Sequence, residues 1–112
     1  MTGLTPAAFA AILAVIIPLG AAPAHAGGPA SVGIDNFTFV PAEITVTAGT
    51  EVTWINHDDI PHVVASSSKL FRSPVLDTDG SYAKSFDEPG TYEYFCALHP
   101  HMTGRVTVVP RN

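Results

Sequence analysis

The sequence predicts an all-β domain, folded as a sandwich or small barrel of seven or eight short strands. Three observations lead to this prediction. Short runs alternate β-branched or aromatic residues with polar ones, turn residues separate the runs at regular intervals, and no helical periodicity persists over a long segment. Many short strands at such even spacing are typical of all-β sandwiches and barrels.

In the first half of the expected domain, four short runs of strand character end at turn residues. These runs are 32–39, 44–47, 52–55 and 62–65. In the first run, Phe37 and Phe39 continue the alternation that Val32 and Ile34 begin, and Pro41 breaks it. Three serines after the fourth run open a polar loop.

The second half shows the same pattern after one irregular stretch. Asp79-Gly80 is a hairpin signal before the run 82–86, and Pro89-Gly90 is a turn signal before the run 91–96. A last run, containing Val106 and Val108, closes the chain. The stretch 70–78 is apolar enough to pack over the core, with one helical turn as an option.

The N-terminal segment has the pattern of a secretory signal. An apolar run from Ala7 to Leu19 is followed by the small-residue triplet Ala24-His25-Ala26, and an apolar region ending in A-x-A predicts cleavage. The alternative is a retained membrane anchor, although the run is short for a span and Pro18 interrupts its end. We predict a signal peptide at 1–26 and a single domain at 27–112. The protein would be periplasmic or otherwise exported, with no stable membrane span after processing.

Charge and cysteine content narrow the classes of partner. The formal charge is −5 and the sequence contains no basic run, so nucleic acid is not an expected partner. A basic protein surface fits better, because opposite potentials speed encounter, and we expect the protein to be a monomer. The single cysteine of the chain cannot form an internal disulfide, which leaves a reactive thiol, an intermolecular bridge or a metal ligand.

The segment Cys96-Ala97-Leu98-His99-Pro100-His101-Met102 is the strongest functional signal. It offers a thiolate, an imidazole and a thioether within one short loop, and these ligand types suit copper. A trigonal His2Cys site with a weak axial Met needs one more imidazole, for which His62 is the candidate. Zinc is less well matched, because structural zinc sites usually have four Cys or His ligands. Without these neighbours, Cys96 would more simply be an inert buried residue.

The remaining histidines have other expected roles. His57 lies in a polar turn and is expected at the surface, and His25 lies in the predicted signal. His101 lies between two predicted ligands, so we expect it to point away from the metal. Tyr92 and Tyr94 precede Cys96 after a turn, where a tyrosine corner is expected, with a hydroxyl bonded to main chain.

Two longer segments resemble the cupredoxin (type 1 blue copper) family. The segment 52–56 with Pro61-His62 resembles the region of the first ligand, and 89–104 resembles the loop of the other ligands. The two-residue gap between His99 and Met102 is similar to that of amicyanin-like members, whereas plastocyanin-like members have a longer gap. The resemblance covers nearly all of 31–109.

The resemblance implies one copper ion, with His62, Cys96 and His99 as equatorial ligands and Met102 as the axial ligand. It also implies a Greek-key β-sandwich and a periplasmic one-electron carrier that is not an enzyme. An amine dehydrogenase is then the expected donor and a c-type cytochrome the expected acceptor. Two alternatives remain: copper delivery or storage, and a small copper oxidase or reductase, which would need a second metal centre.

Two positions depart from the family pattern. Members commonly have Asn after the first His ligand and Ser or Thr after the Cys, and these side chains tie the ligand loops together. Here the positions hold Val63 and Ala97. We therefore expect the loops to be held more by packing than by a side-chain hydrogen bond.

Overall fold

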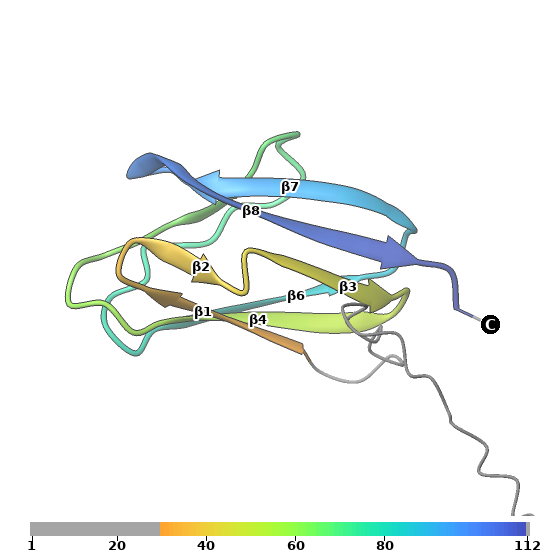
Figure 1. Cartoon of the computed structure of the whole chain (residues 1–112), viewed down its shortest axis with the longest axis horizontal. Helices are drawn as coiled ribbons and strands as arrows, with labels where there is room; N and C mark the ends of the chain where they lie inside the picture. Colours follow the sequence, from red (N-terminus) through yellow and green to blue (C-terminus); the bar gives the residue numbers. More distant parts are fainter. Residues whose placement is uncertain (1–29, 112) are drawn as a thin grey trace, which may run out of the picture.

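A computed structural model describes residues 30–111, which form two four-stranded β-sheets packed face to face (Figure 1). The predicted all-β sandwich is confirmed, and residues 30–111 contain eight strands, the larger of the two predicted numbers. The strands are β1 Ala30–Asp35, β2 Thr38–Val40, β3 Glu43–Thr47, β4 Thr50–Asn56, β5 Val64–Ser66, β6 Ser81–Phe86, β7 Gly90–Cys96 and β8 His99–Val109. The predicted signal, its His25 and the boundary at residue 27 lie outside the described residues. Within residues 30–111, no helix is long and apolar enough to cross a membrane.

Each sheet mixes parallel and antiparallel neighbours. One sheet has the order β2-β1-β4-β6, in which β1 and β4 are parallel. The other has the order β3-β8-β7-β5, in which β3 and β8 are parallel. Consecutive strands therefore cross between the sheets repeatedly, so that segments distant in sequence meet at the ends of the sandwich.

The core forms because each strand buries alternate side chains. On β4, the residues Thr50, Val52, Trp54 and Asn56 are buried, while those between them are at least partly exposed. Trp54 meets Tyr94 of the opposite sheet edge to face, with ring centroids 5.3 Å apart. Such burial is worth about 1.5–3 kcal/mol for each large apolar side chain.

The predicted alternation through 32–39 is wrong at Phe37. Asn36 and Phe37 both adopt left-handed backbone conformations, with φ of 50° and 59°, so a tight turn separates β1 from β2. The turn shifts the alternation, and Phe37 is half exposed while Phe39 is buried. Phe37 is consequently available at the end of the sandwich.

The stretch 70–78 packs over the core as expected, but it contains no helical turn. Phe71 and Leu76 are buried, whereas Leu70 and Val75 are exposed. Its backbone is extended because it pairs with other segments, through bridges from His62 to Leu76 and from Ala65 to Arg72. The strand predicted from the run 62–65 is also shorter than expected at its start, because β5 begins only at Val64.

The tyrosine corner is present at Tyr92. Its hydroxyl donates a hydrogen bond of 2.6 Å to the carbonyl oxygen of Glu88, just before β7. This bond fixes the corner from which β7 runs across the sandwich. At the opposite end of the sandwich, the β1–β2 turn, the loop after β4 and the β7–β8 turn come together (Figure 1).

Candidate metal centre

Cys96 and His99 lie on either side of the short turn that joins β7 to β8. Cys96 is the last residue of β7, His99 is the first of β8, and the two are register partners. The register shifts between Phe95 and Cys96, and irregularities of this kind redirect side chains at the end of a strand. The turn therefore presents both candidate ligands at one end of the sandwich.

His62 is held in place by its own backbone. In the loop between β4 and β5, its nitrogen donates to the Leu76 carbonyl at 3.0 Å, and its carbonyl accepts from the Leu76 nitrogen at 2.8 Å. Its side chain is fully buried. The position of the His62 main chain is thus set by the fold, and its ring lies inside the protein.

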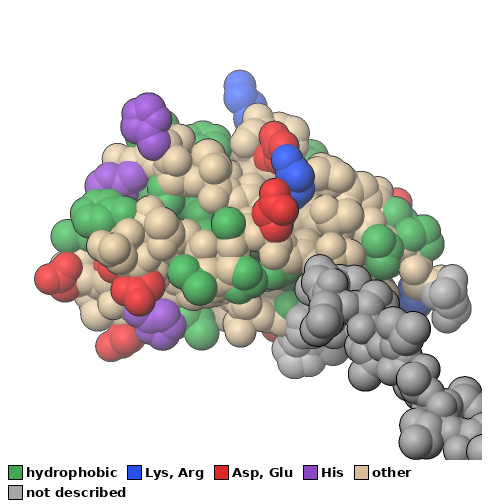
Figure 2. Space-filling view, viewed as in Figure 1, with side chains coloured by type: hydrophobic (Ala, Val, Ile, Leu, Met, Phe, Trp, Pro, Cys, Tyr) green, Lys and Arg blue, Asp and Glu red, His purple; other side chains and the backbone are tan. Residues whose placement is uncertain are grey.

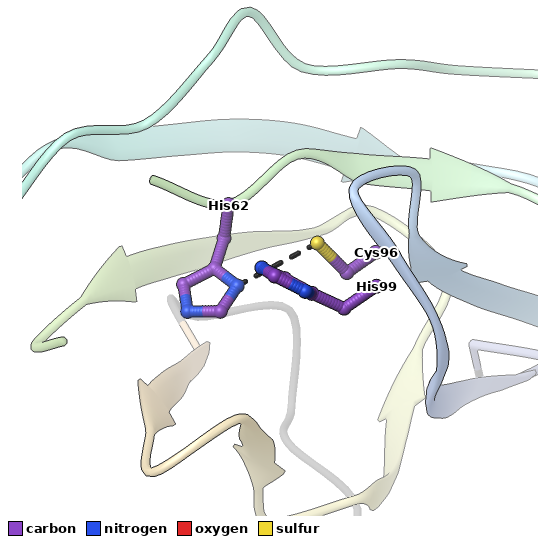
Figure 3. A group of neighbouring side chains, drawn as sticks. All are labelled: His62, Cys96 and His99. Carbon is purple, nitrogen blue, oxygen red and sulfur yellow. Dashed lines mark hydrogen bonds between the residues drawn. The ribbon is translucent and has the colours of Figure 1, made fainter. Parts of the chain in front are cut away.

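The structure brings His62, Cys96 and His99 together, as the sequence predicts (Figure 3). One ligand atom of each lies within 4.8 Å of the others, and within residues 30–111 they are the one such group of three or more His, Cys, Asp or Glu side chains. His62 Nδ1 lies 3.5 Å from Cys96 Sγ. His62 and Cys96 are fully buried, whereas His99 is half-buried.

Met102 is buried on β8 and belongs to the same core cluster as Cys96. A buried thioether at this position fits either core packing or a weak axial contact with a metal. His101, its neighbour, is exposed, and so is His57. Both surface predictions are therefore confirmed.

The two ligand loops are joined by main-chain hydrogen bonds, which the sequence analysis missed. Ala97 N donates to the Val63 carbonyl at 3.1 Å, and Val63 N donates to Cys96 Sγ at 3.4 Å. The expectation that packing would replace the usual side-chain bond is incomplete, because backbone groups make this connection. The Val63 N–H group thus places a hydrogen-bond donor directly beside the candidate sulfur ligand.

Asn56 organises the loop that leads to His62. Its side-chain nitrogen donates to the carbonyls of Ile60 and Leu76, both at 2.9 Å, and its side-chain oxygen accepts from Asp58 N at 2.9 Å. The sequence carried one signal for this role: Asn56 continues the buried alternation of β4, and a buried amide must find partners.

Asp58 is a second residue that the sequence analysis missed. Its carboxylate accepts hydrogen bonds from His62 Nε2 at 2.8 Å, from Asn36 N at 2.6 Å and from Phe37 N at 3.0 Å. Burial raises the pKa of Asp58, but these hydrogen bonds together hold it below its ordinary value. Nothing in the local pattern of the polar turn 56–59 indicated these distant partners.

Phe37 lies against both histidines. Its ring centroid is 5.1 Å from that of His99 and 5.9 Å from that of His62, with both pairs in edge-to-face geometry. In Figure 2, the visible histidine side chains lie at the left end of the molecule, with hydrophobic side chains between them and acidic ones nearby. The centre therefore lies under an apolar rim.

The donor set fits copper on its own chemistry. A thiolate and two imidazoles within one buried cluster match a trigonal His2Cys site, and a buried thioether is available on β8. Three of the four side chains, those of His62, Cys96 and Met102, are buried, which limits the access of water to the site. These side chains would hold a copper ion that exchanges single electrons.

Comparisons with known proteins point to one family. The family model described as "Cupredoxin-like domain" matches residues 7–108. The chain is 39% identical to amicyanin of Paracoccus versutus, over 69% of this chain and 62% of that protein. It is 36% identical to amicyanin-alpha of Methylorubrum extorquens, over 90% of this chain and 96% of that protein.

Solved structures show the same likeness. The structure of an oxidized amicyanin variant superposes with a TM-score of 0.70 at 33% identity, covering 73% of this chain and 83% of that one. A copper-containing nitrite reductase from Thermus scotoductus also matches, with a TM-score of 0.68 at 28% identity, but the match covers 72% of this chain and 22% of that one.

These findings define a small blue copper protein by fold and by site. The chain belongs to the cupredoxin-like family, and one type 1 copper ion is its cofactor.

Proposed function

We propose that this protein is an exported one-electron carrier whose copper is bound by His62, Cys96 and His99, with Met102 as the axial ligand. The observation that supports this most strongly is the convergence of one sulfur and two imidazoles within 4.8 Å. The similarity to amicyanins and plastocyanins supports electron transfer as the role.

Each residue has a separate task in this proposal. Cys96 supplies the thiolate, and the Val63 N–H beside it stabilises the negative charge. His62 supplies Nδ1, because its Nε2 is committed to Asp58. When bound, the copper supplies the change between Cu(I) and Cu(II). Backbone hydrogen bonds hold the ligand loops, so the site can keep one geometry in both redox states.

His99 is the proposed route for electrons between the site and a partner. It is the least buried of the three converging ligands. Phe37 and Leu98 next to it are about half exposed, at 50% and 47%, and they provide an apolar surface for docking. The net charge of −5 would steer a basic partner toward the protein. We propose an amine dehydrogenase as donor and a c-type cytochrome as acceptor, by analogy with the amicyanins that the chain resembles.

Periplasmic location and the absence of catalysis belong to the same proposal. Export would follow from the signal pattern in residues 1–26. Four protein ligands around one ion would leave no open position for a substrate, so the protein would pass electrons and not catalyse a reaction itself. Copper delivery is the competing function, but buried ligands favour retention of the metal over its exchange.

Absorption and EPR spectra of the protein with Cu(II) test this function. Intense visible sulfur-to-copper charge transfer and a reversible one-electron couple are expected, and Cys96→Ser should abolish the absorption. His101→Ala is the matched control, because His101 lies in the same loop but is exposed, and it should retain the spectrum. A colourless protein that binds only Cu(I) would instead indicate copper delivery.

A further inference from the structure

The Asp58 carboxylate joins the first copper ligand to a separate turn. Oδ2 accepts from His62 Nε2 at 2.8 Å and from Phe37 N at 3.0 Å, while Oδ1 accepts from Asn36 N at 2.6 Å. The Asp58 side chain is 11% exposed and that of His62 is fully buried. One carboxylate thus holds two parts of the chain that lie about twenty residues apart.

This arrangement selects one tautomer of His62. An ionised carboxylate can only accept hydrogen bonds, so Nε2 must carry the proton that it donates. In the neutral ring, Nδ1 then has a free lone pair, and Nδ1 is the atom that lies 3.5 Å from Cys96 Sγ. A carboxylate behind a ligating histidine also increases the electron-donating strength of the ring.

The same carboxylate stabilises a strained turn. Asn36 and Phe37 both have φ in the left-handed region, which costs about 1–2 kcal/mol for a residue with a side chain. Both of their N–H groups point at Asp58, and bonds to a charged acceptor are stronger than neutral ones. The turn in turn places the Phe37 ring against His62 and His99.

The backbone of Asp58 is itself fixed. Its nitrogen donates to Asn56 Oδ1 at 2.9 Å, and its carbonyl accepts from the Thr78 hydroxyl at 2.7 Å. The carboxylate is therefore part of a rigid loop and does not depend on a flexible side chain finding its partners. Such rigidity is what a positioning residue requires.

We propose that Asp58 is a positioning residue of the copper centre: it fixes the tautomer and donor strength of His62 and clamps Phe37 over both histidines. The inference rests on the proposed copper site, and it adds a residue that acts through His62 without touching the metal. Because the carboxylate places negative charge behind a ligand, it favours Cu(II) over Cu(I).

The test compares Asp58→Asn with Asp59→Asn, which removes the same charge from the exposed neighbouring residue. Asp58→Asn should weaken Cu(II) binding relative to Cu(I) by about tenfold, the lower end of typical effects of such partners. A tenfold change corresponds to an upward shift of about 59 mV in a one-electron potential. Asp59→Asn should shift the potential far less, and Asp58→Glu should restore part of the change.

A second measurement does not depend on copper. Amide hydrogen exchange of Asn36 and Phe37, in the protein as purified, should accelerate in Asp58→Asn and remain unchanged in Asp59→Asn. Unchanged amide exchange in Asp58→Asn would overturn the proposal that Asp58 clamps the turn. Equal shifts of the reduction potential in the two variants would mean that only the net charge matters, and would overturn the positioning role. If the unmodified protein lacked the blue copper spectrum, the proposed function would fail, while the exchange result would still report on Asp58.

Discussion

The main-chain nitrogen of Ala97 donates a hydrogen bond of 3.1 Å to the carbonyl of Val63, and this bond joins the loops that carry Cys96 and His62. Cupredoxins that the sequence resembles commonly use two polar side chains at these positions. Here the side chains are apolar, and backbone groups connect the loops without leaving a polar side chain unpaired in the core.

Introducing the polar pair tests how these loops are held. Val63 is buried, so Val63→Asn alone should lower the free energy of unfolding by about 1–3 kcal/mol, because its amide lacks a side-chain partner. Adding Ala97→Thr should restore about 0.5–1.5 kcal/mol through a new hydrogen bond. Denaturant unfolding of both single variants and the double variant measures this coupling. Purely additive effects would show that the two side chains do not interact.

Position 104 on β8 must be a glycine because the ring of Tyr94, its register partner on β7, occupies the space beside it. A Cβ at Gly104 would overlap the Tyr94 ring, and both residues are part of the rigid sheet. Gly104→Ala should therefore lower the free energy of unfolding by about 1–3 kcal/mol, the usual cost of overpacking. The exposed neighbour Thr103 provides the control, since Thr103→Ala should change the stability by less than about 0.5 kcal/mol. Similar losses in both variants would contradict the steric explanation.

Because the Tyr94 hydroxyl is buried, we expect the protein to lose stability at high pH. Burial raises the pKa of Tyr94 from 10.0 to about 12, opposed by the neighbouring Trp54 side chain. Between these pH values the unfolded chain loses the phenolic proton while the folded protein keeps it, so stability falls as pH rises. The slope approaches about 1.4 kcal/mol per pH unit for one group.

Tyr94→Phe isolates this effect. Within residues 30–111 the hydroxyl has no hydrogen-bond partner, so its removal should cost little at neutral pH. Above about pH 10, the reference pKa of tyrosine, the variant should become progressively more stable than the unmodified protein. The difference in unfolding free energy, measured against pH, gives the result directly. A difference that stays constant with pH would contradict a raised pKa.

Copper removal should destabilise the fold through mass action. A ligand that binds only the folded state at 100 times its dissociation constant adds about 2.7 kcal/mol to the free energy of unfolding. We therefore expect the free energy of unfolding, measured by thermal unfolding, to be higher with Cu(II) than with an excess of chelator by at least about 2.7 kcal/mol. Cys96→Ser should show a much smaller difference, because it lacks the thiolate. Equal differences in the two proteins would mean that Cys96 does not bind the stabilising metal.

The backbone conformation of Phe37 predicts that a glycine variant at this position is more stable than an alanine variant, which is the reverse of the usual order. Glycine normally destabilises relative to alanine, but at a φ of 59° alanine retains the left-handed strain and glycine does not. Phe37→Gly should be more stable than Phe37→Ala by about 1 kcal/mol. At Thr38, in β2, the order should be the ordinary one, with alanine the more stable. The same order at both positions would indicate that Phe37 is not held in this conformation in solution.

Much of the fold could be predicted because alternation is a local property. The runs that became β3, β4, β6, β7 and the C-terminal part of β8 were identifiable from periodicity and turn residues, whereas the first part of β8, from His99, was expected to be a loop. The exceptions have a common cause. Phe37 leaves the alternation because a distant carboxylate supports the turn beside it, and 70–78 is extended because its backbone pairs with the segment around His62.

The sequence by itself determined the candidate ligand types, their spacing and the class of protein, because Cys96, His99 and Met102 lie within seven consecutive residues whose chemistry needs no knowledge of distant contacts. Only the tertiary structure decided how His62 is oriented and what surrounds it. Asp58 and Phe37 reach the site through hydrogen bonds and ring contacts between segments that the sandwich topology brings together. Local patterns cannot specify such contacts, since they depend on which strands become neighbours.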